Sequence, residues 1–252
     1  MVRHRRYGKN LKKCEASCKV NKNKKNCGKL IVLDGLDGCG KSTQFQAVLK
    51  QLRKNGKSIH GISFPDYSSP SGQLIQMYLN GDFSTTPNGV NAYAASSFYA
   101  VDRYANYKLH WEKDYQNGDW ILASRYTTSN AIHQMSKLPQ TQWDEFLQWL
   151  DIYEYEQLGL PRPDLVLFLS IPLKISQNLL QKRYASNSGK RDIHESDLAY
   201  LEKCRSAAFY AAEKQGWHII PCTEKKAGLE EETLLLVDTI KEKLLARIET
   251  LL

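Results

Sequence analysis

A glycine-rich segment, residues 35–43 (GLDGCGKST), fits the pattern GxxxxGK[ST]. It follows the apolar run Leu30–Leu33 and precedes a segment whose apolar residues recur at helical spacing. In such a loop the glycines let backbone N–H groups converge on phosphate oxygens, and the N-terminus of the next helix adds its positive dipole end. We therefore expect a phosphate loop that binds ATP through Gly35, Gly38, Cys39, Gly40, Lys41, Ser42 and Thr43.

Two side chains of this loop have specific tasks in phosphoryl transfer. Lys41 is expected to bridge the β- and γ-phosphates of ATP, and the Ser42 hydroxyl to bind Mg²⁺. A glycine turn that merely joined a strand to a helix would need neither residue. GTPases share the loop but also carry an NKxD motif, and Asn21-Lys22 and Asn23-Lys24 are neither placed nor completed as such a motif requires.

Arginines elsewhere in the chain indicate a second anionic substrate. Transfer between two nucleotides gathers several phosphates, which calls for fixed guanidinium groups. Arg125 follows the end of a predicted strand, where open α/β sheets bind ligands. Arg103 is followed by a tyrosine, as Arg125 is. A third basic group flanks a polar stretch and predicts a mobile lid at about residues 184–196; its members are Arg183, Lys190 and Arg191. A solvated helix face is the alternative explanation for Arg103, Arg125 and Arg183.

Strand-like and helix-like segments alternate along the chain, which predicts an α/β fold with a parallel sheet. The expected strands are Leu30–Leu33, Ile59–Phe64, Trp120–Ala123, Leu165–Leu169 and Trp217–Pro221. Helices are expected after the phosphate loop up to Gly56, around Leu74–Tyr78 before Gly81, from about Val90 to Tyr115, after a cap at Thr141, and over Leu229–Leu252. The fold class is therefore a three-layer P-loop NTPase fold, with a five-stranded parallel sheet flanked by helices.

Charge divides the chain into two parts. The net charge is +8, but residues 1–29 alone carry eleven Lys or Arg against one acid, which leaves −2 for the remainder. This distribution predicts a basic, disordered extension (residues 1–28) and a kinase domain (residues 29–252). The slightly acidic domain argues against a nucleic-acid-binding protein, although the basic tail leaves that possibility open.

The six cysteines do not form a disulfide framework in a chain of 252 residues. Cys14, Cys18 and Cys27 in the tail are too irregularly spaced for an ordinary zinc site. No apolar run reaches the ~18 residues of a membrane span. We therefore expect a cytoplasmic protein with reduced thiols and no membrane association.

Five short motifs follow one another along the chain. They are Leu33–Gly38 leading into the phosphate loop, Phe64–Tyr67 with Pro70–Gly72, Phe98–Arg103, Ser124–Tyr126 with Ser129 and Gln134, and Arg162–Leu169. Their order and spacing make the sequence resemble the thymidylate kinases over nearly all of residues 29–245.

The resemblance implies a role for each matching residue. Asp37 would accept a hydrogen bond from the acceptor's 3′-hydroxyl, and Arg125 would hold its phosphate. Tyr99 would stack on thymine while Arg103 donates to a thymine carbonyl. Arg183 and Arg191 would supply the catalytic charges from the lid, since Gly38 stands where some members carry an arginine. The predicted acceptor site also includes Phe64, Tyr67, His133 and Gln134.

Three positions depart from the family's pattern. Ser124 replaces an acid that helps to hold Mg²⁺ through water, and Asp34 is the candidate to take over that task. Tyr67 stands where an arginine often follows the Phe-Pro pair. His133 replaces the aromatic ring that commonly packs beneath the deoxyribose and excludes a 2′-hydroxyl, so the choice of sugar is the least constrained part of the prediction.

The favoured function is thymidylate kinase, which converts ATP and dTMP to ADP and dTDP. One alternative is a kinase for another nucleoside monophosphate or a deoxynucleoside, because His133 and Tyr67 alter the acceptor pocket. A second is a nucleotide-binding paralogue that has lost turnover through Ser124. The resemblance also suggests a homodimer.

Overall fold

The structure is a computed structural model that describes residues 27–186, 197–225 and 232–251. Most of the predicted basic extension and most of the predicted lid, including Arg191, lie outside these residues. Among the described residues, no helix is both long and apolar enough to cross a membrane.

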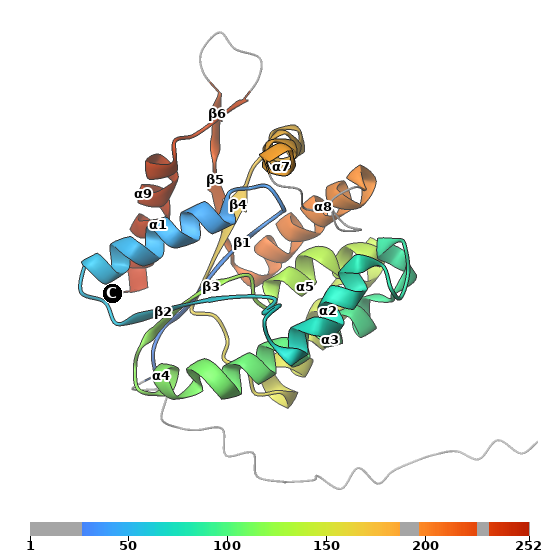
Figure 1. Cartoon of the computed structure of the whole chain (residues 1–252), viewed down its shortest axis with the longest axis horizontal. Coiled ribbons are helices and arrows are strands. Elements are labelled where there is room, and N and C mark those ends of the chain that lie inside the picture. The colour runs from blue at the N-terminus through green and yellow to red at the C-terminus, as the bar shows by residue number, and fades with distance from the viewer. Residues whose placement is uncertain (1–26, 187–196, 226–231, 252) are drawn as a thin grey trace, which may run out of the picture.

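Five parallel strands form the central sheet, in the order β2-β3-β1-β4-β5 (Figure 1). Their bounds are β1 Leu30–Gly35, β2 Ile59–Ser63, β3 Trp120–Ser124, β4 Leu165–Ser170 and β5 His218–Pro221. All five predicted strands are confirmed, with ends that differ by one or two residues. β1 lies at the centre, between β3 and β4, and its six residues are all buried.

Successive side chains of β1 alternate between two hydrophobic cores, as the strand geometry requires. Ile31 and Leu33 face a core built with α1 (Lys41–Lys54) and α9 (Val237–Ile248). Leu30 and Val32 face a second core on the other side of the sheet. Helices therefore cover both faces, which confirms the predicted three-layer architecture.

The other helices of the described chain are α2 (Pro70–Asn80), α3 (Ala92–Asn106), α4 (Glu112–Gln116), α5 (Thr128–His133), α6 (Trp143–Asp151), α7 (Leu173–Ser186) and α8 (Leu198–Gln215). Among these, α5, α6 and α8 pack together through a third cluster that includes Phe146, Ala208 and Phe168. α2 lies across α3 beside the strand ends (Figure 1).

The sequence prediction was wrong in three details. The long helix Val90–Tyr115 is interrupted by a π-helical segment, Tyr107–Trp111, that joins α3 to α4. Thr141 does not cap α6, which begins at Trp143 after a 3-10 turn. The last helix starts at Val237, not Leu229, because Thr223–Lys225 (β6) and Glu232–Leu234 (β7) pair as a small antiparallel ribbon.

Candidate active site

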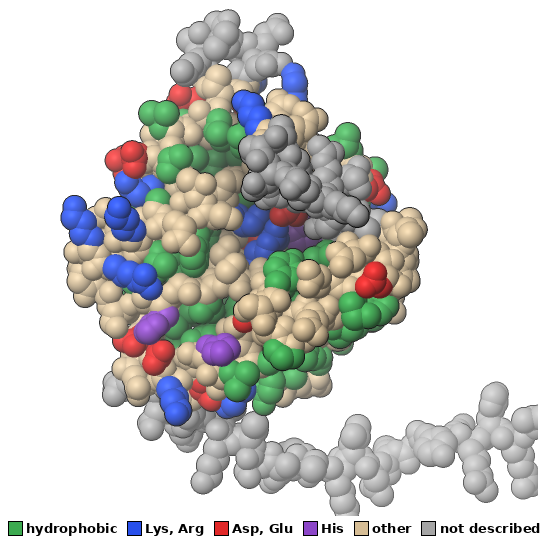
Figure 2. Space-filling model, in the orientation of Figure 1, with side chains coloured by type: hydrophobic (Ala, Val, Ile, Leu, Met, Phe, Trp, Pro, Cys, Tyr) green, Lys and Arg blue, Asp and Glu red, His purple; other side chains and the backbone are tan. Residues whose placement is uncertain are grey.

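A cavity of about 720 Å³ opens where the carboxyl ends of β1, β2 and β3 meet. Figure 2 shows it as a hollow in which basic side chains and a histidine are visible. The phosphate loop lines one end, with Asp37, Lys41 and Ser42. Side chains from α3 and α5 line the other end; these are Tyr99, Arg103, Asn130 and His133. One continuous cavity therefore joins the loop to every predicted acceptor residue.

The phosphate loop has the backbone that its sequence demands. Gly40 caps α1 in the left-handed conformation, at φ 85°. Gly38 is also left-handed, at φ 78°, and a Cβ there would lie 2.6 Å from the Ser176 carbonyl oxygen. Gly38 is therefore sterically closed to a side chain, which agrees with the absence of an arginine at this position.

The Lys41 side chain lies over the phosphate loop and contacts its backbone. Its Nζ donates to the carbonyl oxygens of Gly35 (2.7 Å) and Leu36 (2.8 Å), and lies 3.9 Å from the Asp37 carboxylate. The Cys39 side chain points into the core, where burial raises the pKa of its thiol. Cys39 can therefore serve the loop through its backbone, and a reactive thiolate at this position is disfavoured.

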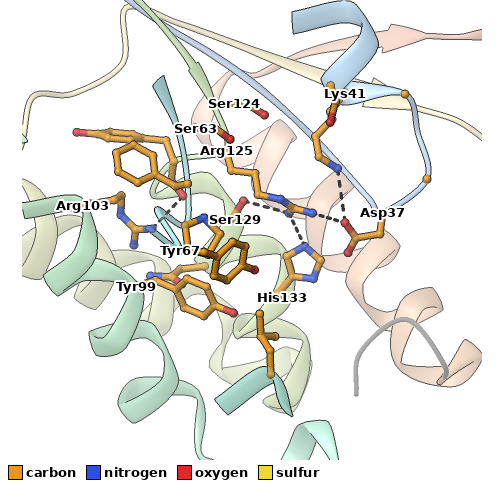
Figure 3. Close-up of a pocket in the computed structure, with 18 of the residues that line it drawn as sticks. Asp37, Lys41, Ser63, Tyr67, Tyr99, Arg103, Ser124, Arg125, Ser129 and His133 are labelled. Carbon is orange, nitrogen blue, oxygen red and sulfur yellow. Dashed lines mark hydrogen bonds and ion pairs between the residues drawn. The ribbon is translucent and has the colours of Figure 1, made fainter. Parts of the chain in front are cut away.

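Arg125 is the most constrained residue at the strand ends. It adopts φ 66°, a conformation that is uncommon for a residue other than glycine, while its backbone N–H donates to Leu33 O at 3.0 Å. The guanidinium forms a close ion pair with Asp37 and donates from Nη1 to His133 Nε2 at 3.1 Å (Figure 3). Burial lowers the pKa of Arg125, but the Asp37 and Asp34 carboxylates outweigh it and the net direction is upward. This side chain is a fixed cation in the middle of the cavity.

Asp34 lies behind Arg125 and is fully buried. Its carboxylate accepts hydrogen bonds from the Gly35 N–H (2.8 Å), Thr128 Oγ1 (2.6 Å) and Ser129 Oγ (2.8 Å). It does not line the cavity, whereas Ser42 and Ser124 do. A small cation such as Mg²⁺ takes oxygen ligands and keeps several waters. The exposed hydroxyl of Ser42 fits a direct ligand of Mg²⁺. Asp34 does not line the cavity, so it fits a group that acts on the ion indirectly.

The far end of the cavity is built around a buried ion pair. Arg103 Nε donates to Glu154 Oε2 (2.7 Å), and its Nη2 donates to Glu154 Oε1 (2.5 Å). The third nitrogen, Nη1, donates to the backbone oxygen of Tyr126 at 3.3 Å. Burial lowers the pKa of Arg103, yet the Glu154 carboxylate more than compensates and the pKa is raised. With 1% of its surface exposed, Arg103 is not on a solvated helix face, so that alternative is wrong.

Aromatic and polar side chains complete this end. Phe64 and Tyr99 line the cavity, and the Tyr99 ring meets Tyr78 edge to face at 6.4 Å. Gln134 is buried, and its Oε1 has no hydrogen-bond partner among the described residues. Tyr67 is half exposed at the rim. These are predicted acceptor residues, and the fold brings them together from α3 and from the segments that follow β2 and α5.

Sequence reasoning missed Asn130 and Glu154. Asn130 stands five residues after Arg125 and lines the same cavity, so its place beside the Ser124–Tyr126 motif was the available signal. Glu154 lies in the π-helical segment Ile152–Gln157, 51 positions from Arg103. No local sequence pattern predicts its contact with Arg103.

The structure describes the two predicted lid arginines only in part. Arg191 is outside the described residues, and Arg183 belongs to the last turn of α7. A group that could hold a metal ion, His60 with Asp114 and Asp119, sits at the amino-terminal ends of β2 and β3. That is the sheet edge opposite the phosphate loop, so this group takes no part in the cavity.

Comparisons with known proteins find relatives that match most of the chain. The family model described as thymidylate kinase matches residues 33–234. A thymidylate kinase of Mycobacterium tuberculosis (strain H37Rv) is 28% identical over 191 residues, which are 75% of this chain and 87% of the relative. That of Plasmodium falciparum is 26% identical over 218 residues, 86% of this chain and 93% of the relative.

A solved structure of thymidylate kinase from Candida albicans shares the fold. It superposes with a TM-score of 0.62 at 24% identity, and the match covers 89% of this chain and 92% of the other. The family match includes the last half of β1, all of β2 to β5, the phosphate loop and every residue that lines the cavity. The chain belongs to the thymidylate kinase family.

Proposed function

We propose that this protein transfers the γ-phosphoryl group of ATP to the 5′-phosphate of dTMP, which yields ADP and dTDP. One observation carries the proposal: a single cavity has a phosphate loop at one end, a fixed arginine in the middle and an aromatic, hydrogen-bonding pocket at the other. A nucleoside monophosphate has the matching order of groups, with a phosphate next to a sugar and then a flat base.

The reaction needs two nucleotides whose phosphates meet in line. An oxygen of the acceptor phosphate attacks the γ-phosphorus, and the bond from that phosphorus to the bridging oxygen of ADP breaks. Lys41 would leave the Gly35 and Leu36 carbonyl oxygens for the β- and γ-phosphates. Arg125 would hold the acceptor phosphate through N–H groups now bonded to Asp37 and His133, which frees Asp37 to accept from the 3′-hydroxyl.

Mg²⁺ is the expected cofactor, and it would neutralise charge on the ATP phosphates. Ser42 is the candidate for a direct ligand because its hydroxyl is exposed in the cavity. Asp34 would contribute from behind, since three donors fix its carboxylate and the cavity wall does not include it. Arg183 and Arg191 remain our candidates for the lid's catalytic charges, and a homodimer remains our expectation for the assembly.

The acceptor would lie with its base between Tyr99 and the residues around Arg103. Tyr99 offers a ring face for stacking, and Phe64 and Gln134 close the remaining sides. His133 would lie against the sugar. Tyr67, half exposed at the rim, would contact the acceptor from the open side.

An ADP-release assay over a panel of nucleoside monophosphates tests the proposal. We expect dTMP to be the best acceptor, with dUMP, dCMP, dGMP and AMP slower, and no turnover in a Lys41→Ala control. The exposed Lys50→Ala on the same helix is the matched control for loss of a lysine. A different preferred acceptor would replace dTMP in the assignment, and ATP binding without any turnover would indicate a binding protein.

A further inference from the structure

Glu154 is the most deeply buried acid at the end of the cavity that is proposed to bind the nucleobase, and none of its surface is exposed. A buried carboxylate is costly unless hydrogen bonds and an opposite charge compensate it. Glu154 has both, since Arg103 donates to its two oxygens and Asn130 Nδ2 donates to Oε1 at 2.9 Å. The two residues that Glu154 holds both line the cavity, although Glu154 itself does not.

These contacts determine which way the Asn130 amide points. Asn130 Nδ2 lies 2.9 Å from Glu154 Oε1 and 3.2 Å from the Ser96 carbonyl oxygen, and both of these groups can only accept. The nitrogen of the amide must therefore face them, and its two N–H groups are used. What Asn130 can still offer a ligand is its carbonyl oxygen, Oδ1, which is an acceptor.

Arg103 is restricted in the same way, but with the opposite polarity. Glu154 takes its Nε–H and one N–H of Nη2, and the Tyr126 carbonyl oxygen takes one N–H of Nη1. A guanidinium has five N–H groups and no acceptor, so the rest of Arg103 can only donate. One carboxylate thus fixes a donor and an acceptor side by side in the cavity wall.

We propose that Glu154 is a positioning residue that sets the base specificity of the site, by holding Arg103 as a donor and Asn130 as an acceptor toward a 2,4-dioxopyrimidine. Thymine and uracil present the complementary pair, a carbonyl oxygen at C4 and an N–H at N3. Cytosine presents an amino group and a bare nitrogen at the same positions, so it meets a donor with a donor and an acceptor with an acceptor. This inference rests on the proposed function and extends it to a residue outside the cavity.

Glu154→Gln tests the idea with almost no change of shape. A carboxamide has one acceptor oxygen, so its NH₂ must face either Arg103 Nε–H or the pair formed by Arg103 Nη2 and Asn130 Nδ2. We expect the KM for dTMP to rise about tenfold or more, because a charged, buried hydrogen bond is lost. The preference for dTMP over dCMP should fall, while the KM for ATP and the kcat for dTMP change less than about threefold. Glu156→Gln, an exposed acid in the same π-helical segment, is the matched control.

Because the charge of Arg103 is left uncompensated, Glu154→Gln also tests the fold, and thermal unfolding is recorded for every variant. Glu154→Asp keeps the charge but is one methylene shorter; we expect a smaller rise in the KM for dTMP and a dTMP preference between those of wild type and Glu154→Gln. Folded variants with a wild-type KM and a wild-type ratio of dTMP to dCMP would overturn the proposal. So would a lower melting temperature with equal losses for ATP, dTMP and dCMP, which is what a purely structural ion pair predicts.

Calorimetric binding of dTMP to the same samples separates this inference from the proposed function. If wild-type protein binds dTMP without phosphorylating it, the proposed reaction fails while the binding constants of the Glu154 variants still test the positioning role. If wild-type protein turns over dTMP normally and the Glu154 variants behave like it, only the inference fails.

Discussion

The guanidinium Nη1 of Arg125 lies 3.1 Å from His133 Nε2. Arginine can only donate, so Nε2 accepts this hydrogen bond and the imidazole is neutral, with its hydrogen on Nδ1. His133 is therefore more than a substitute ring beneath a sugar, because it also anchors the arginine that we assign to the acceptor phosphate. In the proposed function, the groups that would bind the sugar and the phosphate of the acceptor therefore meet at this contact.

We predict that His133→Phe sharpens the choice of sugar. A phenyl ring fills the space under the ribose more completely and offers no hydrogen-bonding nitrogen to a 2′-hydroxyl. The kcat/KM ratio of dTMP to ribothymidine monophosphate should rise about fivefold or more. His218→Phe makes the same replacement at an exposed position of β5 and should leave the ratio unchanged. A ratio that falls in His133→Phe would show that the imidazole itself excludes the 2′-hydroxyl.

A second prediction concerns Arg125 and the two substrates. Asn is the replacement of choice, because it tolerates the left-handed backbone at this position better than Ala does. Arg125→Asn should raise the KM for dTMP by about tenfold or more, since charged hydrogen bonds to the acceptor phosphate are lost, and should change the KM for ATP far less. Arg162→Asn is the control, because Arg162 pairs with Asp151 outside the cavity. Equal losses for both nucleotides would place Arg125 on the ATP side instead.

The parts of the fold that the sequence predicts are those whose signals are local. The phosphate loop is one contiguous segment between a buried strand and a helix, so its pattern and its context are read together. β1 and β4 are short apolar runs, which predicts strands that are buried on both faces. In the structure all of β1 is buried, and the residues of β4 are buried or partly buried. Gly81 ends α2 in the left-handed conformation, as its position in the sequence predicts.

The parts that escape prediction depend on contacts between distant segments. Arg103 could be read either as a surface residue or as a site residue until Glu154 was found beside it, 51 positions away. The ribbon of β6 and β7 is local but was missed for another reason, because each segment has three residues and neither is apolar enough to predict a strand. Helical periodicity does not distinguish α from π geometry over five or six residues, so both π-helical segments were missed.

Ser124→Asp tests whether the missing acid limits magnesium binding. Ser124 lines the cavity beside Arg125, whereas the oxygens of Asp34 already accept from Gly35, Thr128 and Ser129. We therefore expect the new carboxylate to lower the half-saturating Mg²⁺ concentration about threefold or more by adding an anionic oxygen ligand, direct or through water. Ser206→Asp adds an acid at an exposed position of α8 that does not line the cavity, and it controls for charge alone. Lower turnover at every Mg²⁺ concentration would mean that repulsion from Asp34 dominates.

The last prediction concerns the pH dependence of stability near the acceptor pocket. Lys137 donates to Tyr78 Oη (2.6 Å) and to the Val90 carbonyl oxygen (3.1 Å), and Tyr78 in turn meets the Tyr99 ring. Burial lowers the pKa of Lys137 to about 7, whereas a lysine in the unfolded chain titrates near 10.4. Between these values the unfolded chain holds a proton that the folded chain lacks, so Lys137 makes stability rise with pH above about 7 and adds no slope below it. In Lys137→Met this contribution disappears. The free energy of unfolding in urea should therefore rise less steeply from pH 7 to pH 8.5 than in wild type, by less than the ~1.4 kcal/mol per pH unit of one whole proton. The Lys113→Met control, at an exposed position of α4, should keep the wild-type slope, and identical slopes in all three proteins would show that Lys137 stays charged in the folded state.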